Sequence, residues 1–186
     1  MPVLIIAPKF ERVTQITNQW SKALRGDRLD GKEAIRKNFE AIAENYDPII
    51  FYSHGNKRSI IGNDRKPLLD RKNVDLIRGK NVYAMACLTC RDLGVNNYAD
   101  RYLGYYDEFS FTIPAQKIFG AFSNSIATDF YRVNFNPLIY SAKFMKHYRA
   151  ADTTTRMCML KDISAFRQIR NSGLNQSILA ITKIAK

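Results

Sequence analysis

The sequence predicts an α/β fold built on a mainly parallel sheet. Three short apolar runs, at residues 3–7 (VLIIA), 49–53 (IIFYS) and 82–86 (VYAMA), have the composition of strands that are buried on both faces. The segment between the first two runs carries apolar residues at helical spacing. A strand, helical segment and strand in that order favour a right-handed crossover with parallel pairing.

The size and composition of the chain predict one compact domain over residues 1–186. Of its 186 residues, 46% are hydrophobic and 12% are aromatic, which is enough apolar material for a sizeable core. No apolar run approaches the roughly 18 residues of a membrane span. Residues 1–10 favour a first strand rather than a signal peptide. Three cysteines do not make a disulfide framework, so we expect a cytoplasmic protein.

Two helical segments are expected between the first two strands. Apolar residues recur at helical spacing from residue 13 to 24, and Gly26 follows them as a stop signal. A second helix is expected to begin at Asp30, because Glu33 lies three residues later, as in a capping box.

The middle of the chain is expected to alternate polar connections with short elements. Residues 54–80 are polar, with a small hairpin expected near 59–61 and a short helix near 74–78. After the third apolar run, residues 101–106 (RYLGYY) predict a fourth strand, which residues 109–112 (FSFT) extend or follow.

The last third of the chain is expected to be mainly helical. Residues 115–130 place their apolar side chains on one helical face, and Asn136 before Pro137 predicts the start of another helix. The spacing of apolar residues over 160–169 predicts a further helix. Residues 177–186 fit a helix or a strand equally well.

The chain is strongly basic, and the charge is unevenly distributed. It has 29 Lys and Arg against 17 Asp and Glu, a formal net charge of +12. Residues 141–186 carry nine basic against two acidic residues, and residues 57–80 carry eight against three. Such a surface attracts nucleic acid, anionic lipid or an acidic protein. Because no nucleic-acid motif accompanies the charge, we expect it to be spread over the faces of a soluble domain.

Two successive strands of the predicted sheet end in residues whose side chains can take part in catalysis. The second strand leads into His54 and Gly55, and the third leads into Cys87. In open parallel sheets, functional groups gather at the carboxyl ends of the strands. If these two strands are neighbours, His54 and Cys87 emerge at the same edge.

A histidine beside a cysteine makes a nucleophile at neutral pH. The imidazole of His54 could take the proton of the Cys87 thiol or hold the thiolate as an ion pair. A glycine after the base lets the backbone approach a substrate carbonyl, so the N–H groups of Gly55 and Cys87 could form an oxyanion hole. A structural histidine and a buried, inert cysteine are the alternative interpretation.

The C-x-x-C spacing of Cys87 and Cys90 raises two further alternatives. A zinc site needs about four ligands, and the other candidates, His147 and Cys158, lie at a spacing that matches no standard site. A thioredoxin-like dithiol would open a helix after a strand, but the expected partner features are absent. We therefore expect no metal and no cofactor, and we interpret Cys158 as a core residue.

The words FYSHGN and YAMACLTCRDLG resemble the caspase-like cysteine peptidase fold, and among its members the bacterial gingipain-like and CHAT branches. Those proteins have an apolar strand that ends in His-Gly and a later strand that ends in Cys, commonly followed by a small polar residue and a Gly. Thr89 matches the polar position, but Cys90 stands where Gly is common. The segment GVNNYADRYLGYYDEFSF also resembles the family. The resemblance covers about residues 47–112.

The resemblance implies a three-layer sandwich with helices on both faces of the sheet, and a cysteine endopeptidase that acts on a protein or peptide. It implies a catalytic core at about residues 1–130, followed by a basic helical part at about 131–186. His54 would be the general base, Cys87 the nucleophile, and the N–H groups of Gly55 and Cys87 the oxyanion hole. Asp107, with Glu108 next to it, would line a pocket for a basic P1 side chain, and a solvated turn is the alternative for both. A regulatory protein partner is also compatible with this family.

The competing function is a basic interaction module without catalysis. The C-terminal third could bind nucleic acid or an acidic partner protein. The contacts would be basic residues at Lys143, Lys146, Arg149, Arg156 and Arg170. Nearby aromatic residues, Phe144, Tyr148 and Phe166, lie at helical spacing and are expected in the core rather than on a stacking surface. Nucleic-acid binding is therefore the less favoured interpretation.

Overall fold

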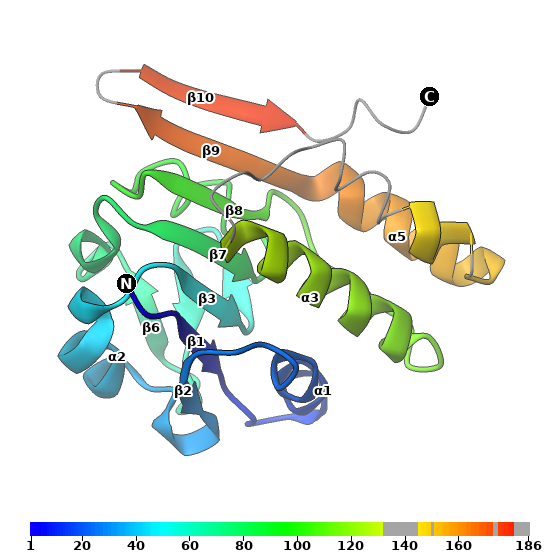
Figure 1. Cartoon of the computed structure of the whole chain (residues 1–186), viewed down its shortest axis with the longest axis horizontal. Coiled ribbons are helices and arrows are strands. Elements are labelled where there is room, and N and C mark those ends of the chain that lie inside the picture. The colour runs from blue at the N-terminus through cyan, green and yellow to red at the C-terminus, as the bar shows by residue number, and fades with distance from the viewer. Residues whose placement is uncertain (132–144, 150, 173–174, 181–186) are drawn as a thin grey trace.

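A computed structural model describes residues 1–131, 145–149, 151–172 and 175–180 (Figure 1). Within these residues the chain forms a seven-stranded sheet with the order β10-β9-β8-β7-β3-β1-β2. The strands are β1 (Leu4–Ala7), β2 (Asp27–Asp30), β3 (Ile49–Tyr52), β7 (Asn81–Met85), β8 (Arg101–Tyr105), β9 (Phe166–Ser172) and β10 (Asn175–Ala180). Figure 1 shows them from β10 at the top to β2 at the bottom.

The sheet is mostly parallel. Neighbouring strands from β2 through β1, β3 and β7 to β8 pair in parallel, whereas β9 pairs antiparallel with both β8 and β10. The central strands β1 and β3 are fully buried along their length, as continuous apolar runs require. The prediction of an α/β fold with a mainly parallel sheet is confirmed.

Both faces of the sheet are covered. Along β1, Ile5 and Ala7 belong to one apolar cluster, while Leu4 and Ile6 belong to a second one. Because successive side chains of a strand point to opposite faces, the two clusters lie on opposite sides of the sheet. The first cluster contains side chains of the helices α1 (Arg12–Ser21), α3 (Gln116–Tyr131) and α5 (Thr153–Ala165), and the second contains Phe39 of α2 (Arg36–Ile42).

A small antiparallel sheet adds to the layer that contains α2. It consists of β4 (Gly55–Asn56), β5 (Ser59–Ile61) and β6 (Pro67–Asp70), and a 3-10 helix, η3 (Val74–Ile77), follows it. The expected hairpin and short helix within residues 54–80 are therefore both present. Because β4 begins directly after His54, this hairpin fixes the backbone that leaves β3.

Three of the predicted elements are wrong. The helix expected from Asp30 is preceded by the edge strand β2, and after a 3-10 turn, η1 (Gly31–Glu33), the helix begins only at Arg36. The helix expected over residues 160–169 ends at Ala165, and the chain continues as strand β9. Residues 109–112 are irregular and do not extend β8. The C-terminal part is thus partly strand rather than wholly helical.

Some expectations fall outside the described residues. The helix predicted to open at Asn136 lies there, and so do Lys143 and Phe144. Of the ambiguous segment 177–186, the part up to Ala180 is strand β10. Among the described helices, none combines the length and the apolar character needed to cross a bilayer.

Candidate active site

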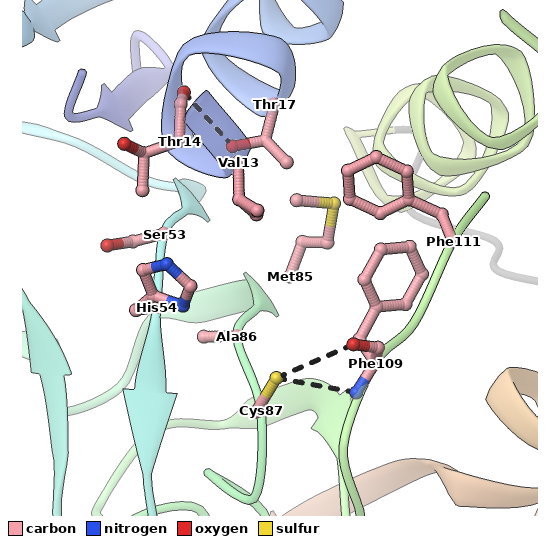
Figure 2. A pocket seen from close by; sticks show the side chains of 10 residues that line it. All are labelled: Val13, Thr14, Thr17, Ser53, His54, Met85, Ala86, Cys87, Phe109 and Phe111. Carbon is pink, nitrogen blue, oxygen red and sulfur yellow. Dashed lines mark hydrogen bonds between the residues drawn. The ribbon is translucent and has the colours of Figure 1, made fainter. Parts of the chain in front are cut away.

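The two strands that carry His54 and Cys87 are neighbours in the sheet. β3 pairs in parallel with β7, and the last pair in register is Tyr52 with Met85. The backbone N–H of Ser53 also donates to the carbonyl of Met85, at 3.2 Å. His54 and Cys87 each lie two residues beyond that last pair, so both emerge from the same edge of the sheet. Figure 2 shows them on the wall of one pocket.

Gly55 brings the two strand ends into direct contact. A Cβ atom placed on Gly55 would lie 2.6 Å from Thr89 Cγ2 and 2.8 Å from the carbonyl oxygen of Cys87. Real Cβ atoms do not approach other heavy atoms so closely, and therefore only glycine allows this packing. The backbone after the histidine consequently lies against the backbone of the cysteine.

The backbone N–H of Gly55 points away from the small sheet. The carbonyl of His54 accepts a hydrogen bond from the N–H of Ile61, and Gly55 is the next residue in register, opposite Ile60. Hydrogen-bonded and non-hydrogen-bonded pairs alternate along an antiparallel ladder, so Gly55 belongs to a non-hydrogen-bonded pair. Within the described chain, the N–H of Cys87 donates to no carbonyl or side-chain oxygen. The small sheet thus leaves the N–H of Gly55 unused, while the N–H of Cys87 interacts with its own thiol.

The imidazole of His54 is held by a carboxylate that the sequence did not reveal. Nε2 of His54 lies 2.5 Å from Oε1 of Glu11. A carboxylate only accepts hydrogen bonds, so Nε2 is the donor in this contact. The ring also contacts Phe10, with 5.7 Å between ring centroids. The Glu11 carboxylate and the Phe10 ring therefore fix the orientation of the imidazole.

Glu11 is itself fixed by its position at the start of a helix. It is the N-cap of α1, and the hydroxyl of Thr14 accepts from its backbone N–H and donates to its carbonyl, both at 3.0 Å. β1 lies beside β3 in the sheet, so α1 starts near the edge where β3 ends. A carboxylate shortly after the first strand was the signal that could have identified Glu11.

The Cys87 thiol lies against an irregular segment that follows β8. Its sulfur accepts a hydrogen bond from the N–H of Phe109 at 3.4 Å and lies 3.8 Å from the carbonyl of the same residue (Figure 2). Burial is the main cause that raises the pKa of the Cys87 thiol, while the N–H of Phe109 lowers it. The charges of Glu108 and Asp162 raise it further. The resting form is accordingly a thiol and not a thiolate.

The backbone turns sharply directly after Cys87. Leu88 has φ +62°, in the left-handed region that residues with a side chain rarely adopt. Its N–H donates to the carbonyl of Asp107 at 3.2 Å. Strained backbone of this kind is found at functional sites, where surrounding contacts hold it in place. The turn leaves Cys87 at the end of its strand with its side chain on the pocket wall.

The pocket between His54 and Cys87 is small and mainly apolar. Its volume is about 40 Å³. It lies where the first turns of α1 meet the ends of β3 and β7 and the segment after β8. Its lining residues are Val13, Thr14, Thr17, Ser53, His54, Met85, Ala86, Cys87, Phe109 and Phe111 (Figure 2).

Asp107 and Glu108 lie near this pocket but do not line it. Asp107 is exposed, and one of its carboxylate oxygens lies 3.6 Å from a guanidinium nitrogen of Arg91 and accepts the N–H of Glu108. Glu108 is exposed as well, although its charge acts on the Cys87 thiol. Their assignment to a pocket for a basic P1 side chain stays a prediction.

A buried carboxyl near Cys87 was missed from the sequence. Asp162 on α5 is only 1% exposed, and its Oδ1 accepts the N–H of Ser110 at 2.9 Å, while its Oδ2 has no hydrogen-bond partner among the described residues. Burial raises the pKa of the Asp162 carboxyl to about 8, although its bond with Ser110 lowers it. Asp162 therefore anchors the segment that covers Cys87. This contact could not be predicted from the sequence, because it joins residues 52 positions apart.

The other predicted ligands are not brought together. Cys90 is 1% exposed in the second apolar cluster, and all three cysteines are free thiols. Cys158 is partly buried and packs against the first cluster. His147 contacts the ring of Phe122, and burial lowers its pKa. In the described part of the chain, no three His, Cys, Asp or Glu side chains are grouped as metal ligands would be.

The basic residues proposed for an interaction module are partly engaged within the chain. Arg156 donates to the backbone carbonyls of Tyr148 and Arg149 at 3.1 and 3.0 Å. Phe166 is fully buried, so its prediction as a core residue is confirmed. Lys143 and the side chain of Arg170 lie outside the described residues.

No protein-family model matches the chain, and no curated protein matches it.

Proposed function

We propose that this chain is a cysteine endopeptidase of the caspase-like type, with Cys87 as nucleophile and His54 as general base. One observation carries the proposal: the ends of two neighbouring parallel strands bring His54 and Cys87 to a single pocket. Gly55, packed against the carbonyl of Cys87, strengthens it, because a glycine after the base is part of the resemblance drawn from the sequence.

In the first chemical step, the thiol loses its proton as it attacks. Because the thiol is protonated at rest and Glu11 already holds Nε2 of His54, Nδ1 takes the proton while Sγ bonds to the carbonyl carbon of the substrate. The imidazolium that forms is stabilised by the Glu11 carboxylate. The pair thus acts by general-base catalysis rather than as a standing ion pair.

The negative charge that forms on the substrate oxygen needs hydrogen-bond donors. The N–H groups of Gly55 and Cys87 are the proposed donors, at the ends of β3 and β7. Each well-placed donor of this kind contributes on the order of 10²-fold or more to the rate. Because Gly55 has no side chain, its backbone lies directly against that of Cys87, which brings the two donors to the same strand ends.

The remaining steps restore the enzyme. The carbon–nitrogen bond breaks, the His54 imidazolium gives its proton to the leaving amine, and a thioester to Cys87 remains. A water molecule, losing its proton to His54, then attacks the thioester carbon. The carbon–sulfur bond breaks, the substrate leaves as a carboxylic acid, and the thiol takes up the proton.

A peptide-library cleavage assay tests this function. We expect Cys87→Ala and His54→Ala each to lower kcat/KM at least about a thousandfold. When catalytic groups act as a unit, removing one of them abolishes nearly all of the activity. Cys90→Ala is the matched control, removing an equal side chain three residues away, and should stay within about threefold of the unaltered protein. Loss of activity in Cys90→Ala with retention in Cys87→Ala would reverse the assignment.

A basic interaction module on the same fold is the alternative that a failed assay would favour. Its affinity for nucleic acid should fall steeply with salt concentration, whereas peptide cleavage should depend little on salt. Thiol reagents should abolish peptide cleavage but should not affect the binding of nucleic acid.

A further inference from the structure

The pocket between His54 and Cys87 lies where a substrate side chain next to the scissile bond would enter. Met85, the last residue of β7, and Cys87 both line this pocket. Figure 2 shows the Met85 side chain extending between the residues of α1 and Phe111. A side chain one bond away from the attacked carbonyl would therefore meet Met85, Val13 and the two phenylalanines after β8.

The described lining of this pocket has no carboxylate that could neutralise a basic substrate side chain. Among the described residues that line it, none is a carboxylate, and His54 is the only titratable one besides Cys87. The hydroxyls of Thr14 and Thr17 already donate to the backbone carbonyls of Glu11 and Thr14, at 3.0 and 3.3 Å. Burying an unpaired ammonium or guanidinium group here would be strongly unfavourable.

The size of the pocket sets a second limit. A volume of about 40 Å³ holds a group equivalent to roughly three water molecules. Large aromatic or long side chains would need Met85 or Phe109 to move. A small aliphatic side chain would fill the space and bury apolar surface against Val13 and Phe111.

We propose that this pocket is the P1 subsite and that it selects a small uncharged aliphatic side chain, of the size of alanine to valine. The inference rests on the proposed peptidase function and names its substrate class. It assigns no specificity role to Asp107 or Glu108, which lie outside the pocket lining.

The test is a set of peptides that differ only at P1, carrying Ala, Val, Phe, Asp or Arg. We expect kcat/KM for Ala and Val to exceed that for Arg and Asp at least about tenfold, the discrimination that an apolar pocket achieves. A preference for Arg, or equal cleavage of all five, would overturn the subsite. If the folded protein cleaves none of them and Cys87 resists an electrophilic peptide probe, the peptidase function fails and the subsite with it.

A substitution at Val13 makes the test independent of the peptide series. Val13 is 38% exposed while it lines the pocket, so a polar residue is tolerated there without unfolding the core. We expect Val13→Asp to raise kcat/KM for the Arg peptide relative to the Val peptide at least about tenfold. Val13→Asn is the control, because asparagine has the size of aspartate without its charge. This variant should not raise cleavage of the Arg peptide relative to the Val peptide. Unchanged P1 preference in Val13→Asp would place the P1 side chain elsewhere.

Discussion

Cys87 and Cys90 are three residues apart, yet they belong to two very different regions of the molecule. Cys87 lines a pocket together with a histidine, two threonines and several apolar side chains. Cys90 lies in the apolar cluster on the opposite side of the sheet and is 1% exposed. The pocket leaves open space beside the Cys87 thiol, whereas the Cys90 thiol is packed among buried apolar side chains.

The packing around Cys90 explains why the second thiol is inert. Its backbone N–H donates to the carbonyl of Tyr105 at 3.0 Å, and a Cβ on Gly104 would lie 3.2 Å from its sulfur. Burial raises the pKa of the Cys90 thiol far above its ordinary value. The comparison teaches that a C-x-x-C spacing does not make a functional pair when the chain turns between its two members.

Thiol labelling should separate the two regions most strongly. With iodoacetamide at pH 8, we expect Cys87 to be alkylated about a thousandfold faster than Cys90, because Cys90 reacts only after part of the core opens. Peptide mapping by mass spectrometry measures both rates in one sample. Cys158, which is partly buried, serves as the internal reference. Equal alkylation rates at Cys87 and Cys90 would contradict the expected difference in accessibility between the two thiols.

A buried carboxyl should make the pocket side of the molecule sensitive to pH. The pKa of Asp162 is about 8 when folded and 3.8 when unfolded, so the folded state retains a proton that the unfolded state releases. Between about pH 4 and 8, this group therefore lowers the free energy of unfolding by about 1 kcal/mol for each unit of rising pH. Above pH 8 the loss levels off.

Asp162→Asn should remove this dependence, because an amide does not titrate. We expect the variant to exceed the unaltered protein in stability by about 4 kcal/mol at pH 8 and to show little gain at pH 4. Urea denaturation at several pH values measures the difference. Asp100→Asn, at an exposed position, is the control and should leave the pH profile unchanged. A parallel pH profile for Asp162→Asn would show that the carboxyl is not the source.

The partner of His54 should have a smaller effect on catalysis. We expect Glu11→Ala to lower kcat about 10- to 100-fold with little change in KM, as loss of an orienting partner does. Glu11→Gln retains a hydrogen-bonding group and should recover part of the rate, with an altered pH profile. Glu44→Ala, at an exposed position in the 3-10 helix η2 (Ala43–Asn45), is the control. An unaffected kcat in Glu11→Ala would mean that the imidazole needs no such partner.

The sequence predicted the parts of the fold that depend on local apolar runs. The strands β1, β3, β7 and β8 were all expected, because each is a short apolar or aromatic segment between polar ones. The edge strand β2, with the sequence DRLD, was missed because it has one apolar residue and pairs on one side alone. Strand β9 was mistaken for a helix because Phe166 and Ile169 are three residues apart, a spacing that a helix would also produce.

Some residues of the candidate site could also be predicted from the sequence, and others could not. His54, Gly55 and Cys87 could be predicted because strand ends in a parallel sheet meet at one edge. Glu11 and Asp162 could not, because their contacts join residues 43 and 52 positions apart and depend on how helices α1 and α5 dock. The sequence therefore predicted which residues meet at the sheet edge, while tertiary packing supplied the groups that contact and cover them.

Glu11 has two structural roles, one in helix α1 and one beside His54. The residue begins α1 and also orients the imidazole, so the first turn of the helix and the base form one structural unit. Helix ends fray more readily than helix centres, and local opening of this kind costs less free energy than global unfolding. Heating would therefore loosen the first turn of α1 and misalign the imidazole while the sheet is still intact. Catalytic competence would then be lost at a lower temperature than the fold.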